Sequence, residues 1–325
     1  MRLRPALSLF ILGTTLLALL PGRPAGGAVR VAFVGDLMLG RDVALAHANG
    51  DWRRTLEAAA PVLSHADLAF GNLESPLTAA PLTRPTHDLR ASPGSAALLA
   101  RLGLDLLSLA NNHALDAGDA GLGDTIQALR SADISFVGPS EAPWERMVEG
   151  LRIAFVAFDD TGAGLDLSGA AASVAAERPR ADLLLISLHW GAELEPAAND
   201  RQRLVASALA AAGADIIVGH GPHVLQEVEW IWGPGRGRST LVAYSLGNAL
   251  FDSPAPPAAR QSAVLIARLD RLGARSVCVV PLGMDPRGWD ILLAGPEAAP
   301  AVLDALRSFD PAGEARLPVC GAEWF

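Results

Sequence analysis

The chain has 325 residues, of which 50% are hydrophobic, so it is long enough for one large domain or two small ones and too apolar to remain disordered. Its net charge of -9 at neutral pH argues against a nucleic-acid partner, because phosphate neutralisation would need a basic face. All 26 basic residues are arginines, which excludes chemistry that depends on a lysine amine.

The N-terminal segment is typical of a targeting signal. Arg2 and Arg4 precede an apolar stretch from Ala6 to Leu20, and small residues follow as far as Ala28. The apolar stretch is shorter than the ~20 residues that a membrane-spanning helix needs, which favours cleavage over a retained anchor. We expect residues 1–28 to be a signal peptide or an N-terminal membrane anchor, with a buried helix as the alternative. The protein would then act outside the cytoplasm, in the periplasm or on the outer side of the cytoplasmic membrane.

The only two cysteines, Cys278 and Cys320, lie near the C-terminal end. In an exported protein they can form a disulfide, and two buried thiols are the alternative. Neither cysteine lies in a pattern that indicates catalysis.

Strand-like and helix-like segments alternate from residue 29 to about residue 220. Apolar runs that predict buried strands occupy residues 29–36, 67–74, 104–113, 151–160, 181–190 and 214–220. Helical patterns occupy residues 92–103, 120–133 and 199–213, and the first of them has the capping pair Ser92 and Pro93. This βαβ rhythm predicts an α/β domain.

The rhythm changes after residue 220. Consecutive strand-like runs separated by turns occupy residues 223–232, 239–248, 262–270 and 276–284. They predict a second sheet with more antiparallel pairing. We place the main domain at residues 29–295 and expect residues 296–325 to form a C-terminal helix and a tail.

Polar side chains follow the apolar strands at their C-terminal ends. These residues are Asp36, Glu74, Asn112, His113, His189, His220 and His223. Ligands bind at this edge of open α/β sheets, so we expect the side chains to converge on one rim. Their oxygen and nitrogen donors suit Mn, Fe or Zn, and a shared carboxylate can bridge two ions.

Each of these residues also has a simpler interpretation when it is taken alone. Asp36 can cap a following helix, and Glu74 can be a solvated turn residue. The asparagines can form turns, and the histidines can be core or loop residues. The set as a whole nevertheless favours a metal site, because the only histidines away from a strand end are His47, His65 and His87.

The same residues lie in motifs that carry a family resemblance. In chain order the motifs are "GDLMLGRD", "FGNLESPLT", "LSLANNHALDAGDAGLGDTIQAL", "SLHWGAELEP", "GADIIVGHGPHVLQ" and "YSLGNALFD". Over residues 29–285 the chain resembles the CapA-like poly-gamma-glutamate capsule synthesis (PGA_cap) family of the calcineurin-like metallophosphoesterase superfamily. The resemblance implies an α/β fold in the form of a four-layer α-β-β-α sandwich with two central mixed sheets. It also implies two divalent metal ions at the sheet edge.

The resemblance implies a role for each matching residue. Asp36 would bind the first metal and take part in catalysis, and Glu74 would bridge the two metals. His113 would protonate the leaving oxygen or stabilise the transition state. The other metal ligands would be Asn112 and His189 on the second ion, His223 on the first, and His220.

Further motif positions would surround the substrate. Glu193 and Gln202, which follow "HWG", would contact the substrate or support the metal ligands. Tyr244 and Asn248 of the "YSLGN" motif would line the pocket, and Arg41 is a candidate for gripping an anionic group.

Three positions depart from the family pattern. Many relatives have a histidine where this chain has Gly221, whereas others read His-Gly-Pro-His, as here. The second metal therefore either loses a ligand or takes His220 in its place, so the site would hold one ion or two. Leu194 replaces a tyrosine and Ala249 replaces a phenylalanine, and both changes would alter the pocket without removing a reactive group.

Two functions compete. The first is an exported metal-dependent hydrolase or transferase, in which a metal-activated hydroxide attacks a phosphoester or an acyl bond of a capsule or wall polymer while His113 assists the departing group. The second is a non-catalytic component of a capsule assembly or export complex that grips an anionic polymer through Arg41, Arg84 and Arg90. The partners would be poly-gamma-glutamate or an envelope phosphoester, and capsule-synthesis membrane proteins. A sensor or structural protein on a degenerate scaffold is a third reading.

Overall fold

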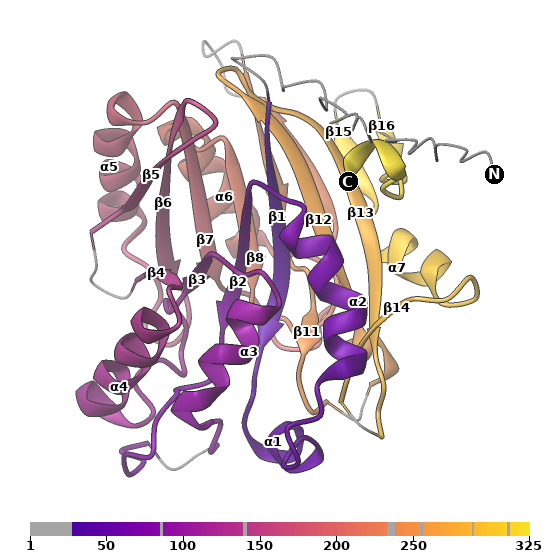
Figure 1. The fold of residues 1–325 in the computed structure, drawn as a ribbon. Helices are drawn as coiled ribbons and strands as arrows, with labels where there is room; N and C mark the ends of the chain where they lie inside the picture. The colour runs from indigo at the N-terminus through magenta and orange to yellow at the C-terminus, as the bar shows by residue number, and fades with distance from the viewer. Residues whose placement is uncertain are drawn as a thin grey trace, which may run out of the picture.

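Two mixed β-sheets form the centre of the molecule, and helices cover their outer faces (Figure 1). The computed structural model describes residues 28–84, 87–138, 142–232, 238–253, 256–287, 289–310 and 313–325. The predicted signal peptide lies outside the described residues, apart from its last position.

The first sheet contains eight strands. They are β1 (Val29–Leu37), β2 (Leu68–Leu73), β3 (Leu106–Ser108), β4 (Ser135–Val137), β11 (Asn248–Leu250), β12 (Gln261–Asp270), β13 (Gly273–Met284) and β14 (Ile291–Leu293). The order is β14-β13-β12-β1-β2-β3-β4, and β11 pairs with β1. The strands β1 to β4 are parallel, whereas the neighbours β1, β12, β13 and β14 are antiparallel to one another.

The second sheet also contains eight strands. They are β5 (Trp144–Val148), β6 (Leu151–Asp159), β7 (Leu183–His189), β8 (Ile216–His220), β9 (Val228–Trp232), β10 (Ser239–Ala243), β15 (Ser308–Asp310) and β16 (Gly313–Ala315). Their order is β16-β15-β9-β10-β8-β7-β6-β5. A parallel centre of β6, β7, β8 and β10 is flanked by the antiparallel strands β5 and β9.

The predicted division into an α/β part and a later separate sheet is wrong. Antiparallel pairs are present after residue 220, as predicted, but β9 and β10 extend the second sheet and β11 to β14 extend the first. The early strands are likewise divided, with β1 to β4 in one sheet and β5 to β8 in the other. A strand buried on both faces has the same apolar pattern in either sheet, so the pattern could not assign it.

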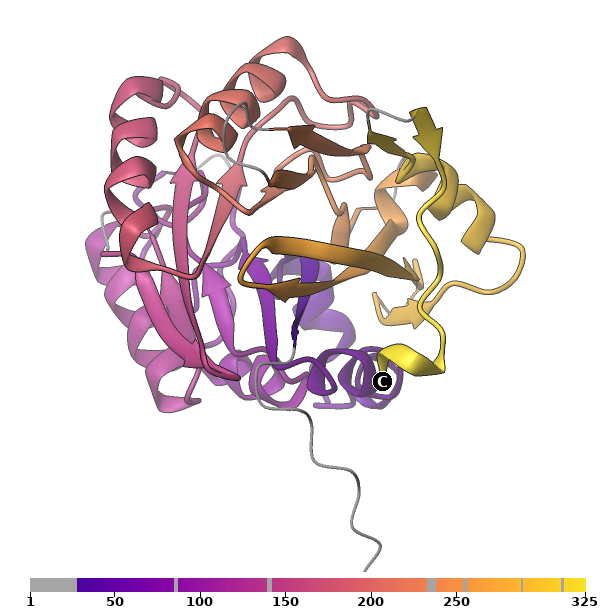
Figure 2. The same cartoon turned by 90° about the horizontal axis from the view of Figure 1, so that it is seen from above.

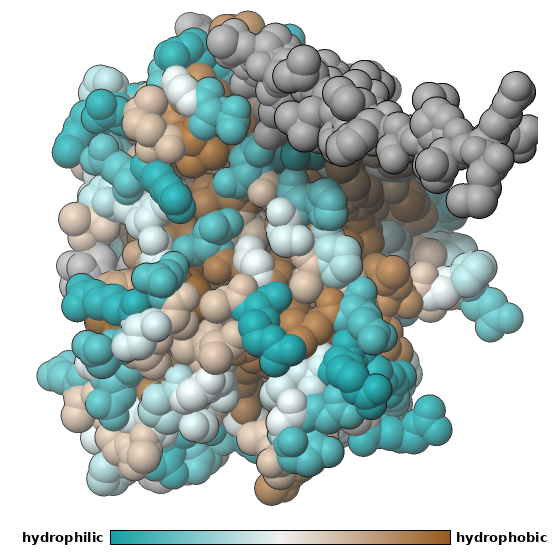
Figure 3. Space-filling model, viewed as in Figure 1, coloured by the Kyte–Doolittle hydropathy of each residue, from teal (hydrophilic) through white to brown (hydrophobic). Residues whose placement is uncertain are grey.

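Helices complete four layers. α1 (Arg41–Ala46), α2 (Arg53–Ser64), α3 (Ala96–Arg101) and α4 (Gly118–Ser131) lie on the first sheet, and α5 (Leu167–Glu177) and α6 (Asp200–Ala212) lie on the second. α7 (Ala299–Ala305) packs beside the inter-sheet core. Figure 2 shows the helices around the outside of the strands, and Figure 3 shows the face with α1 to α4 as a mixture of hydrophilic and apolar residues. The predicted α-β-β-α sandwich with two central mixed sheets is confirmed.

The layer between the sheets is a core of buried aromatic and aliphatic side chains. Phe33, Phe70 and Phe155 are fully buried there, and the rings of Phe70 and Phe155 stack with their centroids 4.8 Å apart. Burial of each large apolar side chain stabilises the fold by about 1.5–3 kcal/mol. This core holds the two sheets in a fixed position, and the polar strand ends lie at one end of it.

The C-terminal tail is part of the fold. A disulfide joins Cys278 of β13 to Cys320, so the pairing that the sequence left open is present. The tail then reaches the start of β1, where Arg30 Nη1 donates to the main-chain oxygen of Trp324 over 2.8 Å. The first and last described residues therefore lie at the same end of the molecule, whereas β1 leads to α1 at the other end (Figure 1). Among the described residues, we find no helix with the length and hydropathy needed to cross a bilayer.

Candidate metal centre

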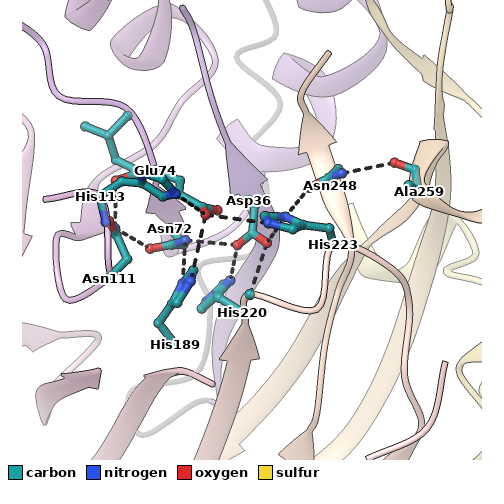
Figure 4. Close-up of polar contacts among 12 residues, drawn as sticks. Asp36, Asn72, Glu74, Asn111, His113, His189, His220, His223, Asn248 and Ala259 are labelled. Carbon is teal, nitrogen blue, oxygen red and sulfur yellow. Dashed lines mark hydrogen bonds and ion pairs between the residues drawn. The ribbon is translucent and has the colours of Figure 1, made fainter. Parts of the chain in front are cut away.

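Two rows of neighbouring residues bring the candidate ligands together. In the first sheet, Asp36 pairs with Asn248 of β11 on one side and with Asn72 of β2 on the other. In the second sheet, His189 of β7 pairs with His220 of β8. Asp36, Asn72 and the two histidines lie at the C-terminal ends of parallel strands, whereas Asn248 begins β11. The two rows face each other across the end of the inter-sheet layer (Figure 4). The predicted convergence of the strand ends on one rim is therefore present.

Two glycines allow the strands to approach closely enough to form this rim. A Cβ atom at Gly35 would lie 2.0 Å from the main-chain oxygen of Gly247, and one at Gly219 would lie 2.0 Å from the main-chain oxygen of Tyr244. No side chain tolerates such a distance. The apolar strands therefore end in glycine because the backbones meet there.

Asp36 is the most heavily contacted of the candidate ligands. Its Oδ1 lies 2.9 Å from Asn72 Nδ2 and 3.1 Å from His220 Nδ1, and its Oδ2 lies 3.2 Å from the amide nitrogen of Gly221 and 3.4 Å from His223 Nδ1. Burial opposes ionisation, but the hydrogen bonds with His220 and His223 outweigh it and hold the pKa of Asp36 well below its usual range. The residue is therefore an anion in the folded protein.

Glu74 lies at the centre of three imidazoles. Its Oε1 is 3.7 Å from His223 Nε2, 3.8 Å from His189 Nε2 and 3.9 Å from His113 Nε2. Neither of its carboxyl oxygens has a hydrogen-bond partner among the described residues. Burial raises the pKa of Glu74 well above its usual range, and the charge of His223 only partly opposes this. A divalent cation beside the carboxyl group would stabilise its ionised form.

The histidines have opposite electrostatic environments. Burial lowers the pKa of His189 to about 3, so its imidazole is neutral and can act as a ligand. Burial also opposes protonation of His223, but the charge of Glu74 and the hydrogen bond with Asp36 raise its pKa to about 10. His223 Nδ1 additionally lies 2.9 Å from Asn248 Oδ1, which fixes the orientation of the ring.

His113 is oriented by a carboxylate that the sequence analysis did not identify. Its Nδ1 lies 2.7 Å from Asp116 Oδ2, and Asp116 is buried. The amide of His113 also donates to Asn111 Oδ1 over 3.1 Å. The ring therefore presents Nε2 to the pocket. The spacing of three residues between His113 and Asp116 was the available signal.

Asn72 is a second residue that sequence reasoning missed. It is fully buried, its amide contacts Asp36, and its Oδ1 accepts a hydrogen bond from Asn111 Nδ2 over 3.1 Å. Its Nδ2 also lies 3.4 Å from His189 Nδ1. Asn72 thus connects the ligands of the two sheets. Its position two residues before Glu74 in the strand was the signal, because alternate residues share a face.

The backbone explains the departure at Gly221. This residue has φ +105°, and a Cβ there would lie 2.8 Å from the main-chain oxygen of Trp190 and 3.0 Å from His189 Nε2. A histidine at this position would need a different backbone. The structure instead brings His220 against Asp36, and His220 Nε2 is buried without a partner among the described residues.

The site opens into a pocket of about 180 Å³. Its lining residues are Arg41, His87, Leu89, His113, Glu193, Leu194, His223, Asn248, Phe251 and Ser253. Three of the expected substrate-binding residues are therefore in its wall, namely Arg41, Glu193 and Asn248. His87, which was assigned no place in the site because it does not end a strand, is also in the wall.

Gln202 and Tyr244 belong to the scaffold instead of the pocket wall, which corrects their expected contact with the substrate. Gln202 is fully buried, accepts from the amide of Asn199 over 3.0 Å and completes a capping box at the start of α6. Tyr244 is also buried, and its hydroxyl donates to Glu229 Oε2 over 2.6 Å. The polar groups of both side chains already have hydrogen-bond partners within the protein.

A divalent metal ion fits this set of residues. Donor atoms of Asp36, Glu74 and His189 all lie within 4.8 Å of one another. Among the described residues, four buried polar atoms of the candidate ligands have no partner, namely Glu74 Oε1 and Oε2, Asn112 Oδ1 and His220 Nε2. Unpaired buried polar atoms are costly, and coordination to an ion removes that cost. The mixture of carboxylate, amide and imidazole suits Mn, Fe or Zn.

Comparisons with known proteins agree with this structure. A solved structure from Mycoplasma pneumoniae, described as a novel phosphatase, has a TM-score of 0.52 and 13% identity, and the match covers 80% of this chain and 96% of that one. This likeness concerns the fold alone.

The sequence relatives are capsule proteins. The PGA biosynthesis protein CapA of Bacillus subtilis (strain 168) is 31% identical over 274 residues, which cover 77% of this chain and 70% of the relative. The capsule biosynthesis protein CapA of Bacillus anthracis is 31% identical over 287 residues, which cover 78% and 67%. A family model described as bacterial capsule synthesis protein PGA_cap matches residues 30–253. The chain therefore belongs to the PGA_cap family of bacterial capsule synthesis proteins and has a metallophosphoesterase-like fold.

Proposed function

We propose that this protein is an exported metal-dependent hydrolase or transferase of capsule biosynthesis. It would act on a phosphoester or an acyl bond of an anionic polymer such as poly-gamma-glutamate. The observation that carries the proposal is the unpaired Glu74 carboxyl group, which lies less than 4 Å from the Nε2 atoms of three histidines at the base of a pocket. The names of the two Bacillus relatives support a role in capsule biosynthesis.

The candidate ligands would hold two divalent ions. They are Asp36, Glu74, Asn112, His189, His220 and His223. When bound, such ions would supply Lewis-acid activation of water and of the substrate oxygens. The hydrogen bonds of Asn72 and Asn248 would keep Asp36 and His223 in place for this purpose.

His113 would act as the general acid–base catalyst. Asp116 would accept a hydrogen bond from the Nδ1–H group of His113, which leaves the second ring nitrogen, Nε2, to exchange a proton with the substrate. A protonated Nε2 donates to the leaving oxygen, and the negative charge of Asp116 stabilises the imidazolium in that state. His113 lines the pocket, where a substrate can reach it.

The contacts of the arginines support an enzyme over a polymer-binding component. Arg41 is bound by both carboxyl oxygens of Asp252. Arg90 is bound by both oxygens of Asp88, each over 2.8 Å. Two of the three arginines that would grip a polyanion are thus already paired within the protein. Arg84, the third, makes no ion pair with a described residue.

The disulfide supports the export part of the proposal. Bonds such as Cys278–Cys320 persist in oxidising compartments and are rare in the cytoplasm. Residues 1–28 would direct export as a signal peptide or as a retained anchor. The main domain of residues 29–295 would follow, and residues 296–325 would form its C-terminal extension.

Metal content measured by elemental analysis tests the proposal. The full-length protein should bind Mn, Fe or Zn and hydrolyse bis(p-nitrophenyl) phosphate. His223→Ala should lose metal and activity, whereas His65→Ala, which changes an exposed histidine at the end of α2, should lose neither. Two equivalents of metal in the native chain would support the dinuclear form, and one equivalent would restrict the proposal to a single ion. A folded protein without metal or hydrolytic activity would refute it.

A further inference from the structure

Two charged side chains line the pocket, one in the wall that each sheet contributes. Arg41 follows β1 of the first sheet, and Glu193 follows β7 of the second. A substrate bound in this pocket can contact both residues, and their pairing decides which charge is available to it.

The charge of Arg41 is already neutralised. Its Nε lies 3.0 Å from Asp252 Oδ2, its Nη2 contacts Oδ1, and the amide of Asp42 donates to the same carboxylate over 3.1 Å. The guanidinium also lies 5.5 Å from the centroid of the Phe251 ring. The first wall therefore presents the Arg41–Asp252 ion pair, which has no net charge, and some N–H groups of Arg41 can still donate.

Glu193 has no such partner. It is exposed, and it makes no hydrogen bond or ion pair with any residue that the structure describes. The next residue, Leu194, has a left-handed backbone with φ +64°, and its amide donates to the main-chain oxygen of Pro222 over 2.8 Å. This bond fixes the loop that carries Glu193 against the loop of His220 and His223.

The carboxylate of Glu193 is therefore held in the wall of the pocket that His223 also lines. The second wall thus adds an unpaired negative charge near residues that would bind an anionic group. Such a charge disfavours an anionic substrate, unless the substrate also carries a cationic group that can pair with Glu193.

We infer that Glu193 recognises an ammonium group of the substrate, so the site takes units that carry a free amine beside the phosphoester or acyl group. The inference rests on the proposed function, because it places the reacting group at the metal ligands. Aminoalkyl phosphoesters and amino-acid units belong to this class. In poly-gamma-glutamate only the terminal unit with a free α-amine belongs to it, because the amines of the internal units are in amide bonds.

Calorimetric binding of two matched probes tests this inference. The probes are 2-aminoethylphosphonate and ethylphosphonate, which differ by the amine, and the protein is the full-length chain loaded with Mn²⁺. The preference for the amine-bearing probe, expressed as the ratio of the two dissociation constants, should fall about threefold to fivefold in Glu193→Gln. Intrinsic differences between the probes cancel when variants are compared in this way.

Glu195→Gln is the matched control. It removes the same charge from the same exposed loop, and Glu195 does not line the pocket. It should keep the native preference, and all three proteins should contain the same amount of metal. Glu193→Gln should bind ethylphosphonate somewhat more tightly than the native chain, because the opposing negative charge is gone. The preference should also weaken as salt is added.

Four results would overturn the inference. An unchanged preference in Glu193→Gln, or an equal loss in Glu195→Gln, would refute amine recognition while leaving the proposed function intact. Loss of metal from Glu193→Gln would identify Glu193 as a metal ligand instead. If the metal-loaded native chain bound neither phosphonate, both the inference and the phosphoester form of the proposed function would fail.

Discussion

Replacing Gly221 with alanine perturbs the turn between the two candidate ligands His220 and His223. The new Cβ would lie 2.8 Å from the main-chain oxygen of Trp190 and 3.0 Å from His189 Nε2. A positive φ costs a non-glycine residue about 1–2 kcal/mol. Forcing the neighbours apart should cost about 1–3 kcal/mol more. The free energy of unfolding should therefore fall by about 2–5 kcal/mol in total.

The two costs can be separated with a second glycine. Gly150, in the turn between β5 and β6, has φ +79°, and a Cβ there would meet nothing within 4 Å. Gly150→Ala should therefore show the backbone cost alone, about 1–2 kcal/mol. Urea unfolding of the metal-free proteins measures both variants. The metal affinity of Gly221→Ala should also fall, because the methyl group displaces the imidazole of His189.

An equal loss of stability in the two variants, with native metal affinity in Gly221→Ala, would refute this reasoning. It would mean that the turn moves without affecting His189. Relatives with a histidine at this position could then share the present backbone.

Three further predictions concern the His113–Asp116 pair, the disulfide of the C-terminal tail and the protonation of the candidate ligands. Asp116→Asn should lower turnover about tenfold or more at unchanged metal content, because it removes the charge that stabilises the imidazolium; parallel loss of metal would contradict this. Replacing Cys278 and Cys320 together with serine should lower the free energy of unfolding by about 2–4 kcal/mol, since the bond joins residues 42 apart. An unchanged urea midpoint would show that the tail is held by other contacts. Metal binding should release a proton and strengthen with rising pH, because the raised pKa of His223, about 10, keeps a proton on the His223–Glu74 pair in the metal-free protein. Equal heats of metal binding in buffers of different ionisation enthalpy would contradict the release of a proton.

The strand ends were predictable from sequence because they depend on local pattern. An apolar run followed by a polar residue identified Asp36 and His189, and both lie where the pattern placed them. The distribution of strands between the sheets was not predictable in this way. β1 pairs with β12, and Val29 lies opposite Leu269. Such pairing depends on contacts between distant segments, which a window of a few residues does not contain.

The roles of motif residues were harder to predict than their positions. Tyr244 and Asn248 lie four residues apart in one motif, yet only Asn248 contacts the site, because the chain turns between them. The partners of His113 and Asp36 were missed for a different reason. Asp116 and Asn72 contribute by orienting other side chains, and a single sequence shows which residues are present but not which of them meet.

The contact between Arg30 and Trp324 brings the two described ends of the chain together, so the fold can be attached to other structures as a unit. Both described ends of the chain lie at one end of β1, and its nine residues place Asp36 and the pocket about 25 Å away. A tether, a surface or a fused domain attached at either end would leave the pocket open on the far side. The geometry thus permits the family to vary what is joined to this unit without rebuilding its ligand rim, and it recommends the N-terminal end for immobilising the protein in binding assays.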